Sequence, residues 1–139
     1  MTDTIDKNQL RFEVELYEDI LQKDPSNMQT RLQLAYNYYY LGRECGQEED
    51  FRKSLSHDLI LHRDEPENAT HLYNIACDYA LLGDKGLSYK FLEKAVGMGV
   101  DYETLENDSD FDSLREEKRF HQILRDAKKR FKINGETHV

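Results

Sequence analysis

Three aspartates, Asp108, Asp110 and Asp112, alternate along the chain as the first ligands of a calcium-binding loop do. Such a loop also needs glycine at its sixth position and glutamate at its twelfth. Counting from Asp108, those two positions hold Ser113 and Arg119, so the match fails. We therefore predict no metal site here and expect a solvated acidic loop whose carboxylates cap a helix.

The histidines and cysteines have no spacing that predicts catalysis or metal binding. His57 and His62 are five residues apart, whereas two zinc ligands on one helix face are four apart. Cys45 and Cys77 form no Cys-x-x-Cys pair, and neither lies in a nucleophile motif. A glycine-rich phosphate loop is also missing from the sequence. The sequence predicts a non-enzymatic protein with no metal and no cofactor.

The composition predicts a helical domain with a large hydrated surface. Charged residues make up 34% of the 139 residues and hydrophobic residues 38%, with only seven glycines and two prolines. No run approaches the roughly 18 apolar residues of a membrane span, and the polar N-terminus lacks the features of a secretory signal. Two cysteines do not suggest a disulfide framework. We therefore expect a cytoplasmic protein that is not bound to a membrane.

The net charge of −9 is distributed unevenly. The segment from Lys118 to Lys132 has seven Lys or Arg residues and one acid, whereas residues 1–117 carry a formal charge of −14. An acidic body disfavours nucleic acid and anionic membranes as partners. We interpret the basic segment as cations that complement the dipole at the end of a helix. Binding of phosphate groups by this segment is the alternative.

The segment 28–41 is predicted to be an inner helix around which the other elements pack. Asn27 is a suitable N-cap, and Gly42 supplies a C-terminal stop. Leu34, Ala35 and Tyr38 share one face. A second, aromatic face carries Leu32, Tyr36, Tyr39 and Tyr40. A helix with two apolar faces must contact two surfaces, so we expect it inside a stack of helices.

Periodicity and turn residues divide the rest of the chain into further elements. Helices are predicted at 5–23, 51–62, 69–82, 85–96 and 116–132. Between them we expect a polar break at 43–50, a short turn at 102–106 and an acidic loop at 107–112. The apolar stripe of the third helix is predicted to contain Phe51, Leu55, Leu59 and Ile60. The stripe of the last helix is predicted to contain Phe120, Ile123, Leu124, Ala127 and Phe131.

An internal repeat is the strongest signal in the sequence. DPSNMQTRLQLAYNYYYLG aligns without gaps to EPENATHLYNIACDYALLG, 41 positions later. Identical residues include the pairs Pro25 and Pro66, Asn27 and Asn68, Ala35 and Ala76, Tyr38 and Tyr79, and Gly42 and Gly83. Each copy reads as helix, turn, helix. Since neither copy could bury its apolar faces alone, we expect the copies to stack.

The repeat resembles the tetratricopeptide repeat family, whose motif is W-x2-L-G-x2-Y, then A-x3-F, then P. The second copy matches at Leu72, Ile75, Ala76, Tyr79, Gly83, Ser88, Leu92 and Ala95, and the first at Leu34, Ala35, Tyr38, Gly42 and Pro66. This resemblance implies an all-α fold of antiparallel helix–turn–helix repeats in a right-handed superhelix. Arg31 replaces the family's large aromatic residue, and the first copy has seven extra residues, which we place at 43–49.

The resemblance also implies the domain organisation. Residues 1–139 are expected to form one domain, and DSDFDSLREEKRFHQIL resembles the capping segment that follows such repeats in bacteria. The expected parts are a half repeat or an N-terminal helix at 5–25, a repeat with a seven-residue insert at 27–66, a repeat at 68–100, an acidic loop and capping helix at 101–132, and a flexible tail at 133–139.

In this family the first helices of the repeats line a concave groove. The resemblance places Gln29, Leu32, Tyr36, Tyr39, Tyr40, Thr70, Tyr73, Cys77 and Leu81 there. Tyrosine offers a large contact area and a hydroxyl, which suits recognition of a partner. The alternative is that the first or last helix covers these tyrosines as core.

The expected function is therefore protein–protein interaction, in which the groove binds a peptide segment of a partner. Relatives that clamp a terminal carboxylate use basic and asparagine side chains, but the matching positions here hold Leu32 and Tyr36, and only Asn74 fits. An apolar or aromatic peptide, with basic residues to suit the acidic body, fits better. Two alternatives are a dedicated chaperone for a client protein and a self-assembling structural module. We expect a monomer or a weak homodimer.

Overall fold

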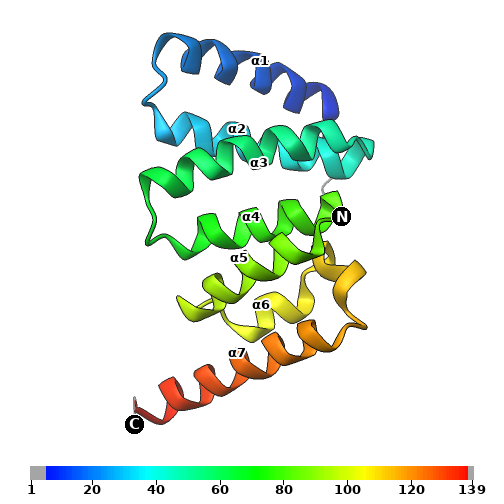
Figure 1. Cartoon of the computed structure of the whole chain (residues 1–139). Helices are drawn as coiled ribbons and strands as arrows, with labels where there is room; N and C mark the ends of the chain where they lie inside the picture. Colours follow the sequence, from blue (N-terminus) through cyan, green and yellow to red (C-terminus); the bar gives the residue numbers. More distant parts are fainter. Residues whose placement is uncertain (1–5, 138–139) are drawn as a thin grey trace. The chain divides into compact units, whose positions relative to one another are not determined.

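A computed structural model describes the backbone of residues 6–137 and the side chains of residues 6–130. All regular structure within that range is helical (Figure 1). The elements are α1 (Lys7–Lys23), α2 (Met28–Cys45), α3 (Glu48–Asp64), α4 (Ala69–Leu82), α5 (Lys85–Gly97), α6 (Tyr102–Asn107), the 3₁₀ helix η1 (Ser109–Leu114) and α7 (Lys118–Thr137). None of the helices in the described residues is long and apolar enough to cross a bilayer.

The chain divides into two compact units, Met1–Asp64 and Glu65–Val139. In unit 1, α2 contacts both α1 and α3. The Asp6 side chain caps α1 by accepting hydrogen bonds from the backbone N–H groups of Asn8 and Gln9. The centre of the α1–α2 interface consists of Leu21, Leu34 and Tyr38, with Val14 and Tyr17 packed against them. This arrangement confirms that Leu34 and Tyr38 lie on a buried apolar face of α2, as predicted.

The predicted end of α2 at Gly42 is wrong. The helix continues to Cys45, and its C-cap is Gly46, whose φ of 68° lies in the left-handed region that glycine favours. Since α3 begins at Glu48, the polar break predicted at 43–50 is mostly helical. The seven extra residues lengthen the two flanking helices. Three acidic residues in the first turn of α3 support this start because they complement the helix dipole.

The predicted apolar stripe of α3 is also partly wrong. Phe51 is buried, but Leu59 is 37% exposed, and Leu55 and Ile60 are half-buried. The buried face of the helix consists of Phe51, Ser54, Asp58 and Leu61. Asp58 is only 2% exposed, and the Ser54 hydroxyl donates to its Oδ2 over 3.4 Å. The prediction followed the apolar residues, whereas this helix buries a face that contains two polar ones.

Unit 2 contains α4 to α7. The predicted bounds of α4 are confirmed: the Asn68 side chain caps its N-terminus, and Gly83, with φ of 84°, caps its C-terminus. Helix α4 contacts α5 and η1, and α7 contacts α5 and α6. The shared core draws on every element of the unit and includes Ala76, Leu92, Leu105, Phe111, Leu114, Phe120, Ile123 and Ala127.

The last helix begins and ends later than predicted. It spans Lys118–Thr137 instead of 116–132, so residues 133–137 of the expected flexible tail belong to the helix. His138, Val139 and the Phe131 side chain lie outside the described residues. Phe120, Ile123 and Ala127 are buried as predicted, with Leu124 half-buried. The two sequence repeats correspond to the helix pairs α2–α3 and α4–α5. The right-handed superhelical stacking of these pairs stays a prediction.

Candidate functional site

Tyr36 and Tyr40 lie on the side of α2 away from its buried face, whereas the ring of Tyr39 also contacts the buried Phe51 of α3, with centroids 6.4 Å apart. The buried face includes Arg31, Leu34 and Tyr38. Tyr40 is 40% exposed, and Tyr36 is half-buried. The other predicted residues of this face are the exposed Gln29 and the half-buried Leu32 and Tyr39. We call Gln29, Leu32, Tyr36, Tyr39 and Tyr40 the tyrosine face.

Contacts within unit 1 hold part of the tyrosine face in place. The rings of Tyr39 and Tyr40 meet edge to face, with centroids 5.2 Å apart. Arg43, one turn further along α2, donates to the Tyr39 hydroxyl over 2.9 Å, and its guanidinium lies 5.8 Å from that ring's centroid. Edge-to-face pairs and cation–π contacts fix the orientation of aromatic rings. This face therefore combines ordered aromatic area, hydroxyl groups and one cation.

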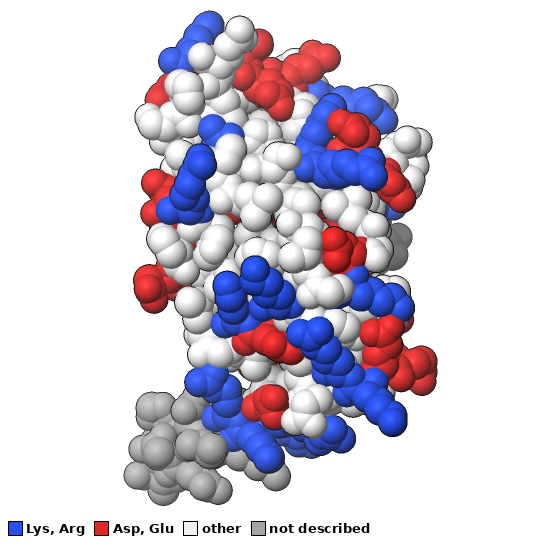
Figure 2. Space-filling view, viewed as in Figure 1, with Lys and Arg blue, Asp and Glu red and all other residues white. Residues whose placement is uncertain are grey.

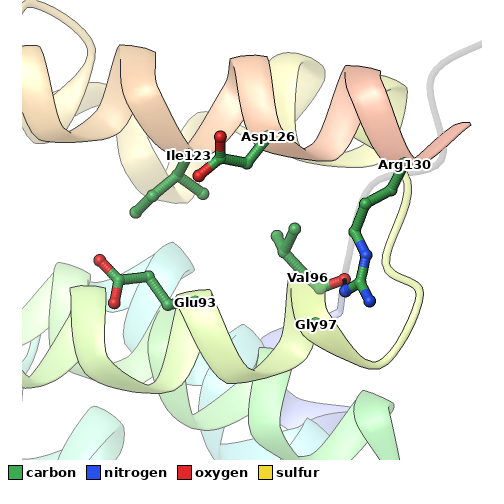
Figure 3. Close-up of a pocket in the computed structure, with 6 residues that line it drawn as sticks. All are labelled: Glu93, Val96, Gly97, Ile123, Asp126 and Arg130. Atoms are coloured by element: carbon green, nitrogen blue, oxygen red, sulfur yellow. Dashed lines mark hydrogen bonds between the residues drawn. The ribbon is translucent and has the colours of Figure 1, made fainter. Parts of the chain in front are cut away.

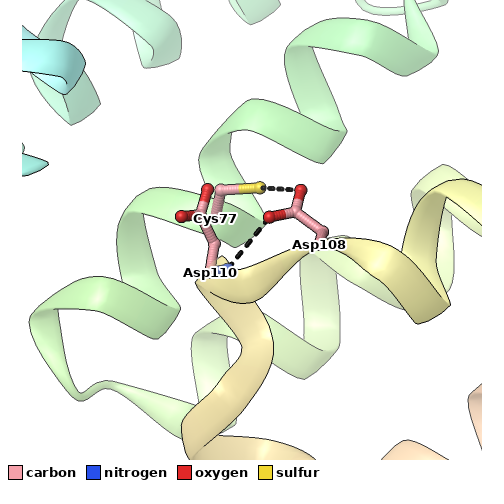
Figure 4. A group of neighbouring side chains, drawn as sticks. All are labelled: Cys77, Asp108 and Asp110. Atoms are coloured by element: carbon pink, nitrogen blue, oxygen red, sulfur yellow. Dashed lines mark hydrogen bonds between the residues drawn. The ribbon is translucent and has the colours of Figure 1, made fainter. Parts of the chain in front are cut away.

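The predicted groove residues of α4 are placed differently. Cys77 lies next to Asp108 and Asp110, at the start of η1 in its own unit (Figure 4). The Tyr73 hydroxyl donates to Asp108 Oδ2 over 2.5 Å, and its ring meets that of Phe111 with centroids 5.7 Å apart. Cys77 Sγ lies 3.8 Å from the same carboxylate oxygen. Thr70 is exposed and Leu81 half-buried. The segment after α6 thus occupies the α4 surface at Tyr73 and Cys77.

The acidic segment packs against α4 and is only partly solvated. Asp108 caps η1, as expected, by accepting from the Asp110 backbone N–H over 2.9 Å. Asp110 is buried, which contradicts the predicted solvation. Arg115 then fastens the segment, because its guanidinium donates to the carbonyl oxygens of Glu106 and Asp108 and to the Asp112 carboxylate.

Cys77, Asp108 and Asp110 offer the nearest approach to a metal-binding cluster among the described side chains. Their ligand atoms lie within 4.8 Å of one another. Burial, reinforced by the carboxylates of Asp108 and Asp110, raises the pKa of the Cys77 thiol, so the sulfur stays protonated. A metal ligand would have to be the thiolate. Because both oxygens of Asp108 already accept hydrogen bonds, the cluster is explained as the joint between α4 and η1.

The hydroxyl of Tyr73 should contribute measurably to this joint. We expect Tyr73→Phe to lower the free energy of unfolding by about 1 kcal/mol, because Asp108 loses a partly buried donor. Urea unfolding followed by circular dichroism measures the change. Tyr102→Phe is the control, since the half-buried Tyr102 packs against the same core. Equal effects of the two variants would show that the hydrogen bond adds nothing.

A polar network joins the three helices of unit 1. The Tyr38 hydroxyl of α2 donates to Glu18 Oε1 of α1 over 2.6 Å, and the Tyr38 ring stacks on His57 of α3 at 6.0 Å. Arg31 of α2 donates to His57 Nδ1 over 2.9 Å and to the Pro25 carbonyl oxygen over 3.0 Å. We did not predict this network. Its one sequence signal was the arginine at the position of the family's large aromatic residue.

His57 should make unit 1 sensitive to acid. Burial, helped by the Arg31 guanidinium and opposed by Glu18, lowers the pKa of His57 from 6.5. The native imidazole therefore stays neutral at pH values where the unfolded chain binds a proton. Stability is then complete above pH 6.5 and falls as the pH drops below it, by up to about 1.4 kcal/mol per pH unit.

Urea unfolding at about pH 7.5 and about pH 5.5 tests this sign. The asparagine in His57→Asn can still accept from Arg31 through Oδ1 but does not titrate. We expect this variant to lose less stability between the two pH values than the wild type does. His121→Asn, at an exposed position, is the control and should keep the wild-type pH dependence. Identical pH dependence in His57→Asn and the wild type would contradict the assignment.

A depression of about 220 Å³ lies between α5 and α7 (Figure 3). Val96 and Ile123 form its apolar floor, and Glu93 and Asp126 line it with carboxylates. Both carboxylates are already engaged, Glu93 with Arg119 over 3.1 Å and Asp126 with the Gln122 amide over 3.0 Å. Arg130, the third charged residue of the lining, donates to the Val96 carbonyl oxygen, so each charged side chain around the depression already has a protein partner.

Basic residues of the segment 118–132 make contacts within unit 2, where Arg119 and Arg130 bind groups of α5. Lysine and arginine side chains gather over α5 and α7 on the face shown in Figure 2, interspersed with acidic ones. Arg130 donates to the Val96 carbonyl oxygen near the end of α5, over 3.2 Å. Lys118, by contrast, begins α7, where the helix dipole disfavours a cation. The dipole interpretation therefore applies to Arg130 and the end of α5, and it is wrong for the start of α7.

Comparison of the sequence with known proteins identifies no relative. No protein-family model matches the sequence, and no curated protein matches it.

Proposed function

We propose that this chain is a protein-interaction module that binds a peptide segment of a partner on the tyrosine face of α2. One observation carries the proposal: Tyr36, Tyr39 and Tyr40 are not members of the hydrophobic core cluster of unit 1, which Leu21, Leu34 and Tyr38 form. Aromatic side chains outside a core are enriched where proteins recognise partners.

The chemistry of this face favours an extended or helical peptide with apolar side chains. The tyrosine rings supply flat apolar area, and their hydroxyls can pair with backbone groups. Gln29 and Arg43 flank the rings with an amide and a cation. The two positions of α4 that face η1, Tyr73 and Cys77, are not part of the proposed surface. The site is therefore smaller than the sequence suggested.

Selection of a displayed random-peptide library against the full chain tests the proposal. We expect peptides that bind the wild type, and a loss of roughly 30-fold or more in affinity for the double variant Tyr36→Ser, Tyr40→Ser, as for central tyrosines of other interfaces. The control is Phe12→Ser, Leu16→Ser, which removes two exposed apolar side chains from α1 instead. Circular dichroism must show that both double variants are folded.

Two outcomes would count against the proposal. Selected peptides that bind both double variants equally well would place the binding surface elsewhere. A molecular mass that rises with concentration in the wild type, and not in the tyrosine variant, would show that this face pairs with a second copy. Sedimentation equilibrium distinguishes that result from binding of a peptide.

A further inference from the structure

Unit 1 contains a depression of about 350 Å³ where its three helices meet. Acidic side chains line one side of this depression, and an arginine and a histidine line the other. Helix α1 contributes Glu18 and Asp19, whereas α2 contributes Arg31 and α3 contributes His57. Leu21 and Gln22 complete the lining. One wall therefore offers hydrogen-bond acceptors and negative charge, and the facing wall offers donors.

Arg31 is the unusual member of this lining. It is 9% exposed, and its known acceptors, the Pro25 carbonyl oxygen and His57 Nδ1, are both neutral. Its Nε is buried without a partner, and within the described residues no ion pair joins its guanidinium to a carboxylate. A buried guanidinium without a carboxylate is costly, because neutral acceptors replace only part of its hydration. An anionic group that enters the depression would lower this cost.

His57 provides a second donor on the same wall. Arginine can only donate, so His57 Nδ1 accepts from Arg31 and the neutral ring carries its proton on Nε2. His57 Nε2 lies 4.0 Å from Glu18 Oε1, which is too long for a hydrogen bond. The Nε2–H group is therefore available to a ligand oxygen.

The acidic wall excludes a simple anion. Glu18 and Asp19 are adjacent on α1, and both are exposed. They would repel phosphate or acetate drawn to Arg31, and they would stabilise an ammonium group next to it. A ligand that suits both walls must carry both charges a short distance apart.

We propose that this depression binds a small zwitterion of the α-amino acid class. Its carboxylate accepts from Arg31 and from His57 Nε2–H, and its ammonium donates to Glu18 and Asp19. The volume is at the small end of ligand sites, which suits a molecule of this size. Because Arg31 lies on the buried face of α2, this site is separate from the tyrosine face and goes beyond the proposed peptide binding.

Titration of the ¹⁵N-labelled full chain with L-leucine and L-glutamine, followed by NMR, tests the site. We expect saturable shifts at the His57 ring and the Arg31 side chain with a Kd of about 1 mM, a strength typical of ligands this small. Acetate and isobutylamine, each with one of the two charges, should bind roughly tenfold more weakly or not at all. Absence of shifts at His57 up to about 10 mM amino acid would overturn the proposal.

Asp19→Asn removes one charge from the acidic wall at an exposed position, where the fold is not at risk. We expect it to weaken L-leucine binding about tenfold. Glu15→Gln is the matched control, because Glu15 is an exposed carboxylate on α1 outside the lining, and it should bind like the wild type. Equal binding by both variants, or acetate binding as tight as L-leucine binding, would show that no zwitterion site exists.

Discussion

Replacing Phe111 with alanine is expected to lower the free energy of unfolding of unit 2 by about 3–5 kcal/mol. Phe111 is fully buried in η1, and its ring packs between those of Tyr73 and Phe120, with centroids 5.7 Å and 5.9 Å away. The substitution removes the ring's buried area and leaves a cavity. A domain is usually stable by only 5–15 kcal/mol, so this loss is a large share of the total.

Amide hydrogen exchange of the full chain measures this effect by region. We expect faster exchange in α4, α5 and α7, which share the core that contains Phe111. Phe12→Ala is the matched control, because it makes the same chemical change at a side chain that is 64% exposed. It should alter stability by no more than about 0.5 kcal/mol. Similar effects of the two substitutions would show that η1 is not part of the core.

The burial of Phe111 also explains why a peptide ligand should not replace the segment after α6 on the surface of α4. Phe111 and Leu114 of this segment are fully buried, as is Leu105 of α6. Their exposure to water would cost about 1.5–3 kcal/mol each. A competing peptide could not easily recover that loss. The α4 surface at Tyr73 and Cys77 therefore belongs to the fold, and the proposed binding surface is confined to α2.

For α4, the sequence supplies both an N-cap and a C-cap residue. Asn68 and Gly83 bracket α4, and the helix has the predicted bounds. The partner of α4 was not predictable in the same way. Asp108 reaches Tyr73 from 35 residues further along the chain. No periodicity or capping rule predicts such a contact, and the family resemblance alone had placed Tyr73 and Cys77 in a groove. Tyr36 and Tyr40 of α2, whose placement depends only on the helix period, could be assigned to one face.

Buried polar residues account for other differences. Asp58 and Ser54 lie on the buried face of α3, whereas Leu59 lies on its exposed face. A hydrophobic pattern cannot find a buried face that carries polar groups, because the pattern is defined by apolar residues. The same holds for Arg31, which is buried through hydrogen bonds to His57 and Pro25. These contacts only become visible once three helices are assembled.

Gly42 and Gly83 show how aligned positions of a repeat can have different roles. Gly83 ends α4 in a left-handed conformation, but Gly42 lies inside α2, where φ is not positive. Glycine is needed at position 42 because the Phe51 ring approaches the α2 backbone closely. A Cβ atom at Gly42 would lie 2.6 Å from Phe51 Cε1 and 2.7 Å from Phe51 Cδ1. The ring of Phe51 on α3 thus occupies the space that a side chain on α2 would need.

We therefore expect Gly42→Ala to lower the free energy of unfolding by up to about 2 kcal/mol. Alanine should favour a helix interior by about 1 kcal/mol, but overpacking of a buried ring costs about 1–3 kcal/mol, and Phe51 is buried and cannot easily yield. Urea unfolding measures the difference. Gly86→Ala in α5 is the control, because its Cβ meets nothing closer than Asp84 Oδ1 at 4.0 Å, and it should be neutral or stabilising.

The double variant Gly42→Ala, Phe51→Leu separates the clash from other causes. If the ring is responsible, Gly42→Ala should cost much less in the Phe51→Leu background, with a coupling energy of about 1 kcal/mol or more. Additive effects would mean that the ring moves aside and that Gly42 has another role. Stabilisation by Gly42→Ala alone would contradict the argument directly, since the helix propensity of alanine would then exceed any cost of contact with Phe51.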